Sequence, residues 1–143
     1  MAADALAQVV EHYHHAADEF IKGNPEPYEA LFSRRADVTL GNPFGPVGRG
    51  WEAITDIMER ASALYRDGEG FRAENITTYV TSELAFIVEK ESFRTKVAGR
   101  GERSSIALRT TSIFRLEQGN WKIMHRQADT VTAARPPESV IQP

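Results

Sequence analysis

Apolar residues recur at helical spacing near the N-terminus, between residues 5 and 22. They are Leu6, Val9, Val10, Tyr13, Ala17, Phe20 and Ile21. This spacing predicts an amphipathic helix with Asp4 as its N-cap, and Gly23-Asn24-Pro25 supplies a C-terminal stop. A short helix is expected over residues 27–32, because Pro27 suits a first helical turn.

A second amphipathic helix is predicted from Trp51 to Arg66. Its apolar face would carry Trp51, Ile54, Met58, Ala61 and Tyr65, and Asp67-Gly68-Glu69-Gly70 would end it. Between the helices, Val38–Leu40 reads as a short strand. The following residues, 41–48, are rich in glycine and proline and are expected to form a tight connecting loop at the mouth of a cavity.

The second half of the chain has the alternating pattern of β-strands. Strands are predicted over Phe71–Val80 and Leu84–Val97, followed by a pair within residues 106–130 that is joined by a turn at Glu117–Asn120. Helices followed by a four-stranded meander predict an α+β fold. A long sheet with helices on one face only has to curl around them, which leaves an internal pocket. We expect one domain over residues 1–143, with residues 133–143 as an extended tail.

The last predicted strand carries the most informative polar residues. Alternation places Ile123, His125, Gln127 and Asp129 on one face, and Lys122, Met124, Arg126 and Ala128 on the other. An imidazole, an amide and a carboxylate in register suit a cavity lining. A single β-bulge in this hairpin would instead bring Arg126 and Ala128 to that face.

Composition narrows the possible functions. The 143 residues include 41% hydrophobic and 26% charged residues, as in an ordinary globular protein, and the net charge of −3 argues against a nucleic-acid surface. Cysteine is absent, which excludes disulfides, thiolate nucleophiles and cysteine metal sites. The N-terminal sequence lacks the pattern of a secretory signal, and no apolar run is long enough to span a membrane, so a cytoplasmic location is expected.

The segments ADVTLGNPFGPVGRGWEAI (residues 36–54) and SIFRLEQGNWKIMHRQAD (residues 112–129), in this order of elements, resemble the nuclear transport factor 2-like superfamily. More narrowly, they resemble its SnoaL-like and ketosteroid-isomerase-like branch. The resemblance covers nearly the whole chain from Ala5 and implies a cone in which a curved sheet wraps around three helices. It also implies a mostly apolar pocket, a small hydrophobic ligand and a homodimer formed through the sheet. It leaves the chemistry open, because this fold hosts many activities.

The resemblance does not carry over the catalytic acids of ketosteroid isomerases. Asn42 stands where those enzymes have their general-base aspartate, and an amide cannot accept a proton near neutral pH. Ser112 stands where they have an aspartic acid, and Tyr13 corresponds to their tyrosine only with a shift of about one helical turn. Relatives often have His-Arg-His-Ala-Asp where this chain has Gln127 as the third residue. Mechanisms that need two imidazoles are therefore disfavoured.

Asp129 and His125 are the predicted catalytic residues. Desolvation at an apolar pocket mouth would raise the pKa of Asp129 and make it a general base, with His125 as a second acid–base or hydrogen-bonding group. The two lie ~13 Å apart along the strand and cannot form a direct dyad. The alternatives are that Asp129 caps the strand end or pairs with an arginine at the rim, and that His125 is a buried histidine with a structural partner.

Other residues have both a structural and a functional interpretation. Tyr13, Asn42, Gln127, Ser112, Phe114, Trp51 and Met58 are the predicted ligand-binding residues, although the apolar ones could simply belong to the core. Glu89 and Glu91 share a strand face. If the register allows, Glu89 would pair with Arg109. Inside the cone this pair could shape a polar pocket floor, but the contact is interpreted as structural because charged residues on strands are mostly exposed.

No metal, cofactor or nucleophile motif is predicted. His12, His14 and His15 do not share a helix face and lack accompanying metal ligands, although His14 could face the pocket rim. The glycine-rich loop lacks the lysine of a phosphate-binding loop, and no serine has nucleophile-elbow context. The sequence therefore predicts a pocket protein that performs cofactor-free acid–base chemistry as an isomerase, dehydratase, cyclase or hydrolase. The alternative is a non-catalytic ligand-binding or dimerisation module.

Overall fold

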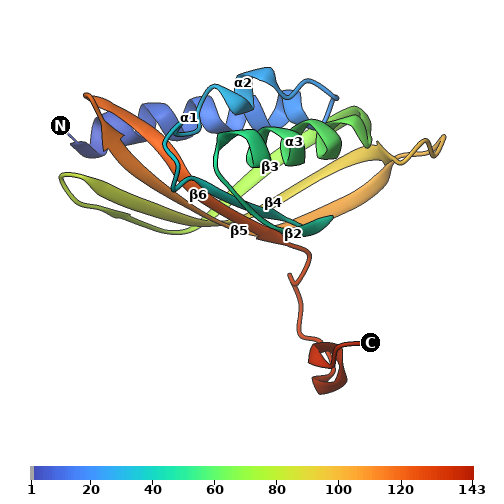
Figure 1. The fold of residues 1–143 in the computed structure, drawn as a ribbon. Coiled ribbons are helices and arrows are strands. Elements are labelled where there is room, and N and C mark those ends of the chain that lie inside the picture. The colour runs from blue at the N-terminus through green and yellow to red at the C-terminus, as the bar shows by residue number, and fades with distance from the viewer. Residues whose placement is uncertain (1) are drawn as a thin grey trace.

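Three helices lie on the concave face of a curved sheet in the computed structural model, which describes residues 2–143 (Figure 1). The helices are α1 (Ala2–Phe20), α2 (Glu26–Glu29) and α3 (Trp51–Ala63). The strands are β1 (Thr39–Asn42), β2 (Gly45–Arg49), β3 (Tyr65–Val80), β4 (Leu84–Val97), β5 (Ser104–Glu117) and β6 (Asn120–Asp129). The sheet curls around the helices without closing, which confirms the predicted α+β cone.

The strand order is β2-β1-β6-β5-β4-β3, and every neighbouring pair is antiparallel except β1 with β6. The predicted meander β3–β6 is confirmed. Its last turn has Gln118 and Gly119 at φ 50° and 84°, the left-handed geometry that a two-residue hairpin requires. Residues 41–48, expected to be a loop, instead form most of the β1–β2 hairpin.

The segment after α3 differs from the prediction. The helix ends at Ala63 and β3 begins at Tyr65, so Asp67-Gly68-Glu69-Gly70 lies inside a strand. The pairing register with β4 shifts on both sides of Glu69, and Asp67 and Gly70 have φ values of 55° and 67°. These residues therefore form bulges that bend the strand. Glycine and aspartate favour such bulges as well as the ends of helices, which is why the segment resembled a helix stop.

A β-bulge also interrupts the last strand. Ile113 pairs with His125 but the next residue, Phe114, pairs with Ile123, so Met124 is the extra residue. Beyond it the alternation is inverted. Ile123 and Arg126 both face the helices, whereas His125 faces the convex side. The prediction that Ile123 shares a face with His125, Gln127 and Asp129 is wrong for this reason.

The chain beyond Asp129 leaves the sheet on the side opposite the helices (Figure 1). Residues 133–143 are exposed, and Val140 and Ile141 retain 87% and 69% of their surface. The tail, expected to be extended, contains one 3₁₀ turn, η1 (Pro137–Val140).

Gly68 allows β3 to approach the end of α1 closely. A Cβ at this position would lie 2.5 Å from Ile21 Cγ1 and 2.7 Å from the Ile21 carbonyl carbon, whereas a Cβ on Gly101 would meet nothing within 4 Å. We expect Gly68→Ala to lower the free energy of unfolding by about 2 kcal/mol through overpacking, and Gly101→Ala to change it little. Urea denaturation measures both variants, and equal stabilities would contradict this packing interpretation.

Candidate functional site

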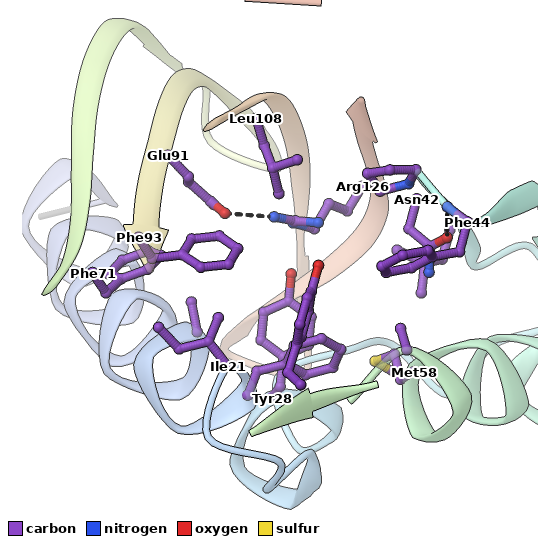
Figure 2. A pocket seen from close by; sticks show the side chains of 16 residues that line it. Ile21, Tyr28, Asn42, Phe44, Met58, Phe71, Glu91, Phe93, Leu108 and Arg126 are labelled. Carbon is purple, nitrogen blue, oxygen red and sulfur yellow. Dashed lines mark hydrogen bonds and ion pairs between the residues drawn. The ribbon is translucent and has the colours of Figure 1, made fainter. Parts of the chain in front are cut away.

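The space between the helices and the concave face of the sheet is lined mainly by aromatic and aliphatic side chains (Figure 2). The aromatic ones are Phe20, Tyr28, Phe44, Tyr65, Phe71 and Phe93. The polar ones are Asn42, Glu91 and Arg126. The cavity that remains among them is small, about 40 Å³, which is room for a few water molecules.

A buried polar cluster forms the floor of this cavity. Arg126 Nη2 donates a hydrogen bond to Glu91 Oε1 at 2.8 Å (Figure 2). Arg126 Nε donates to the Tyr13 hydroxyl, also at 2.8 Å. The Tyr13 hydroxyl in turn donates to Glu91 Oε2 at 3.0 Å and accepts from Ser112 Oγ at 3.2 Å. Four side chains from α1, β4, β5 and β6 are thereby held in one arrangement.

The electrostatics of the cluster keep Arg126 charged and Tyr13 neutral. Arg126, Glu91 and Tyr13 are 7%, 2% and 0% exposed. Burial acts to lower the pKa of Arg126, but the charge of Glu91 and the tyrosine contacts outweigh it and raise that pKa well above the ordinary value. Burial raises the pKa of Tyr13 to about 12. Because a buried charge is costly unless it is paired, the cluster depends on the Arg126–Glu91 ion pair.

Two further tyrosines, Tyr28 and Tyr65, line the cavity with Arg126. Arg126 lies over the ring of Tyr28, with its Cζ atom 5.6 Å from the ring centroid. The Tyr28 hydroxyl points toward the guanidinium (Figure 2). Burial raises the pKa of Tyr28 well above its ordinary value and that of Tyr65 to about 12. Both hydroxyls therefore remain protonated and are potential hydrogen-bond donors to a ligand oxygen.

The tip of the β1–β2 hairpin covers the mouth of the cavity. Asn42 Oδ1 accepts a hydrogen bond from the Phe44 backbone N–H at 2.9 Å, and the Phe44 ring packs 5.8 Å from that of Tyr65. On the outer side of this tip, a surface groove of about 630 Å³ runs between the hairpin and α3. Asn42, Phe44 and Ala61 line both the groove and the cavity, so they form the boundary between the two.

A histidine–carboxylate pair lies one helical turn from the cavity. His14 Nε2 is 2.8 Å from Glu89 Oε1, and the His14 ring packs 6.2 Å from that of Phe71. Glu89 is 2% exposed and His14 is 30% exposed. Burial acts to lower the pKa of His14, but the hydrogen bond and charge of Glu89 raise it more, so that it lies above its ordinary value. His14, predicted to look toward the pocket rim, contacts the cavity residue Phe71 but does not itself line the cavity.

Apart from Gln127, the predicted ligand-binding residues divide into three groups. Asn42 and Met58 line the cavity. Tyr13 and Ser112 belong to its floor cluster, and Phe114 is fully buried with its ring edge-on to Tyr13 at 6.3 Å. Trp51 lies outside the cavity lining at the start of α3, where Arg34 stacks 3.7 Å from its ring centroid.

The residues predicted from the last strand lie on the convex face. Gln127 packs against Gly41 of the neighbouring strand. His125 Nδ1 lies 2.7 Å from Thr39 Oγ1, and burial lowers the pKa of His125. The catalytic roles of His125 and Asp129 stay predictions, and the structure does not bring either residue to the cavity.

Asp129 accepts a hydrogen bond from Arg109 Nε at 2.7 Å, which is the arginine pairing considered as the alternative. Burial acts to raise the pKa of Asp129, but Arg109 and the Val131 N–H lower it more, so it lies below its ordinary value. Desolvation therefore does not supply the raised pKa that a general base would use here. The conditional pairing of Glu89 with Arg109 is wrong, because Glu89 faces the helices and Arg109 pairs with Asp129.

Strict alternation placed Arg126 outward, and its inward alternative required a β-bulge, whereas for Glu89 the surface interpretation was favoured over a place in the pocket floor. The missing information was the bulge at Met124, which turns Arg126 inward. The sequence of β4 did contain a signal for the inward position of its glutamates. Glu89 and Glu91 fall on the same alternate positions as Ala85, Ile87 and Phe93, which are all buried. That phase places both carboxylates on the core face.

Within residues 2–143, no cluster of three or more histidine, aspartate or glutamate side chains has the arrangement of a metal site. None of the helices in this range is long and apolar enough to cross a membrane.

The helices on a curved, unclosed sheet define a nuclear transport factor 2-like cone. More narrowly, residues 6–131 match the sequence model of the SnoaL-like domain, so the chain belongs to the SnoaL-like family. No curated protein sequence matches the chain at a significant level.

Solved structures share the fold at low sequence identity. A proposed dehydratase of the nuclear transport factor 2-like family from Streptomyces avermitilis is 18% identical, with a TM-score of 0.77 over 92% of this chain and 98% of that one. A ketosteroid isomerase-like protein from Erwinia carotovora atroseptica is 13% identical, with a TM-score of 0.75 over 91% and 96%.

A proposed calcium/calmodulin-dependent protein kinase type II association domain from Thiobacillus denitrificans is 12% identical, with a TM-score of 0.67 over 87% and 93%. At such identities these likenesses establish the fold alone.

The His14–Glu89 pair predicts a pH dependence of stability. Because the pKa of His14 is raised in the folded protein, its charged pair with Glu89 stabilises the fold fully below the ordinary value of 6.5, and this contribution is lost as the pH rises through the folded pKa. We expect His14→Gln to destabilise the protein by roughly 1 kcal/mol more at pH 5.5 than at pH 9. Urea denaturation at both pH values measures this, with the exposed His12→Gln as control. A loss independent of pH would contradict the pairing.

Proposed function

We propose that this protein binds a small hydrophobic molecule inside the cone and performs cofactor-free acid–base chemistry on it. The reaction class is that of an isomerase, dehydratase, cyclase or hydrolase. The observation that carries the proposal is the buried Arg126–Glu91–Tyr13 cluster at the floor of a cavity that is otherwise lined by aromatic and aliphatic side chains. Apolar walls with a few convergent polar groups are the usual composition of a ligand site.

The cluster contains groups suited to both halves of a proton transfer. Arg126 and the protonated tyrosines are donors for an oxygen on which negative charge develops. Glu91 is the carboxylate among the lining residues, and each of its oxygens has one hydrogen bond in the cluster, which leaves lone pairs for a substrate proton. We favour Glu91 over Asp129 as the proton acceptor of this proposal because Glu91 lines the cavity, whereas Asp129 lies on the convex face; both carboxylates have an arginine partner.

Ligand entry requires the cavity to enlarge. Its volume of about 40 Å³ is far below the ~300–1,000 Å³ of typical ligand pockets. Phe44 is 47% exposed at the tip of the β1–β2 hairpin and lines both this cavity and the outer groove of about 630 Å³. Phe44 is one of three residues at the boundary between the two spaces, and rotation of its side chain away from Tyr65 would open the cavity toward the groove. The entry route in this proposal therefore passes the hairpin tip.

Filling the cavity tests where the ligand binds. Ala17 lines the cavity from α1, whereas Ala7 on the same helix is exposed. We expect Ala17→Leu to weaken binding of the neutral fluorescent probe N-phenyl-1-naphthylamine about tenfold or more, because the added side chain occupies the site. Ala7→Leu is the matched control and should bind as the wild type does. Fluorescence titration, with thermal melts to verify folding, measures both. An unchanged affinity in Ala17→Leu would contradict a site in the cone.

A second function, assembly into a homodimer through the convex face of the sheet, is favoured by the apolar surface found there. Tyr79 and Leu84 are 57% and 47% exposed. Tyr79 stacks on Phe86 across the β3–β4 pair at 5.5 Å, and a groove of about 670 Å³ near Leu84 is lined in part by Ile113 and Met124. Exposed apolar surface of this kind marks contact regions. The C-terminal tail leaves the sheet on the same side (Figure 1).

Light scattering during size-exclusion chromatography tests this assembly. We expect a dimer for the wild type and a monomer for Tyr79→Glu/Leu84→Glu, because two buried carboxylates without partners oppose association. Ala7→Glu, on the helical side of the molecule, is the control and should remain dimeric. A monomeric wild type, or a double variant that remains dimeric, would contradict assembly through this face.

A further inference from the structure

The guanidinium of Arg126 has donors that its own cluster does not use. Of its five N–H groups, the one on Nε binds Tyr13 and one on Nη2 binds Glu91. Among the described residues, the only enclosed side-chain polar atom without a partner is Thr55 Oγ1. Nη1 has no hydrogen-bond partner in this part of the chain, so it is open to the cavity that Arg126 lines. At the floor of the cavity, the Nη1 end of the guanidinium therefore has N–H groups without a partner, and we call this end the vacant Nη1 edge.

The charge of this edge is already balanced. Arg126 and Glu91 form a closed, buried ion pair 2.8 Å apart. A ligand carboxylate at Nη1 would place a second negative charge beside Glu91 in a desolvated site, with one cation between them. A carbonyl oxygen would accept the same hydrogen bonds without adding a net charge. Arginine usually prefers a carboxylate partner, but here the negative charge of Glu91 opposes the binding of a second carboxylate.

The surrounding donors favour the same ligand chemistry. The hydroxyls of Tyr28 and Tyr65 stay protonated because burial raises both pKa values, so they can donate to an oxygen near Arg126. Phe71 and Phe93 stack with their centroids 6.4 Å apart on the wall of the cavity. Flat aromatic walls suit a planar ligand.

We infer that the site selects a planar, largely aromatic molecule that presents an uncharged carbonyl oxygen to the vacant Nη1 edge of Arg126, and that it rejects the corresponding carboxylate. This inference rests on the proposed function, because it specifies the ligand of the same cavity. It assigns Arg126 as the residue that determines this specificity.

Three probes of similar shape test the inference. They are 2-acetylnaphthalene, 2-isopropylnaphthalene and naphthalene-2-carboxylate, each measured at pH 7 by displacement of N-phenyl-1-naphthylamine from the wild type. We expect the ketone to bind about tenfold more tightly than the hydrocarbon, because it satisfies the vacant donors, and also more tightly than the carboxylate. This comparison needs no variant and is decisive by itself.

A charge-balanced variant assigns the preference to Arg126. Replacing Arg126 alone would leave Glu91 buried and unpaired, so the variant is Arg126→Met/Glu91→Gln, whose folding a thermal melt verifies. We expect the ketone and the hydrocarbon to bind this variant within about twofold of each other, because the donor edge is gone.

Three outcomes would overturn the inference. They are tighter binding of the carboxylate than of the ketone, equal binding of all three probes by the wild type, and a ketone preference that survives in the double variant. If the dye itself does not bind, the proposed function fails, and the inference fails with it.

Discussion

The buried ion pair between Arg126 and Glu91 is the interaction on which the interior of the cone depends. A guanidinium that is 7% exposed is stable there only because a carboxylate and a tyrosine hydroxyl accept its hydrogen bonds. Together with the hydrogen bond from Ser112 to Tyr13, these contacts join α1 to three strands of the sheet. The position of the helix and the polarity of the floor are therefore fixed together. The cavity consequently has mainly apolar walls, and its hydrogen-bond donors are concentrated at the floor around Arg126.

The bulge at Met124 determines which residues take part in this arrangement. Without the extra residue, Arg126 would face outward and His125 would face the helices. With it, Asp129 is tied to the exposed Arg109 on the convex face, a pair worth little to stability. One inserted residue therefore separates a carboxylate on the surface, Asp129, from an arginine in the interior, Arg126.

The fold was largely predictable because its strands and helices follow clear hydrophobic periods. The strand Leu84–Val97 and the turn before Asn120 have the predicted bounds. Glycine-rich segments were harder, because the residues that end helices also form bulges and hairpin tips, as in residues 67–70. The candidate site was predicted only in part. Asn42 lines the cavity and Tyr13 belongs to its floor cluster. Arg126 faces inward because of a β-bulge, which was an open alternative from the sequence but which periodicity alone could not locate.

A crystal structure of the protein with 2-acetylnaphthalene bound tests the central claim most directly. The structure predicts that the carbonyl oxygen lies within hydrogen-bond distance, about 3 Å, of Arg126 Nη1, with the naphthalene ring between the aromatic walls and Phe44 displaced from Tyr65. A ketone bound on the convex face beside His125 and Asp129, or an Arg126 side chain turned away from the cavity, would contradict it.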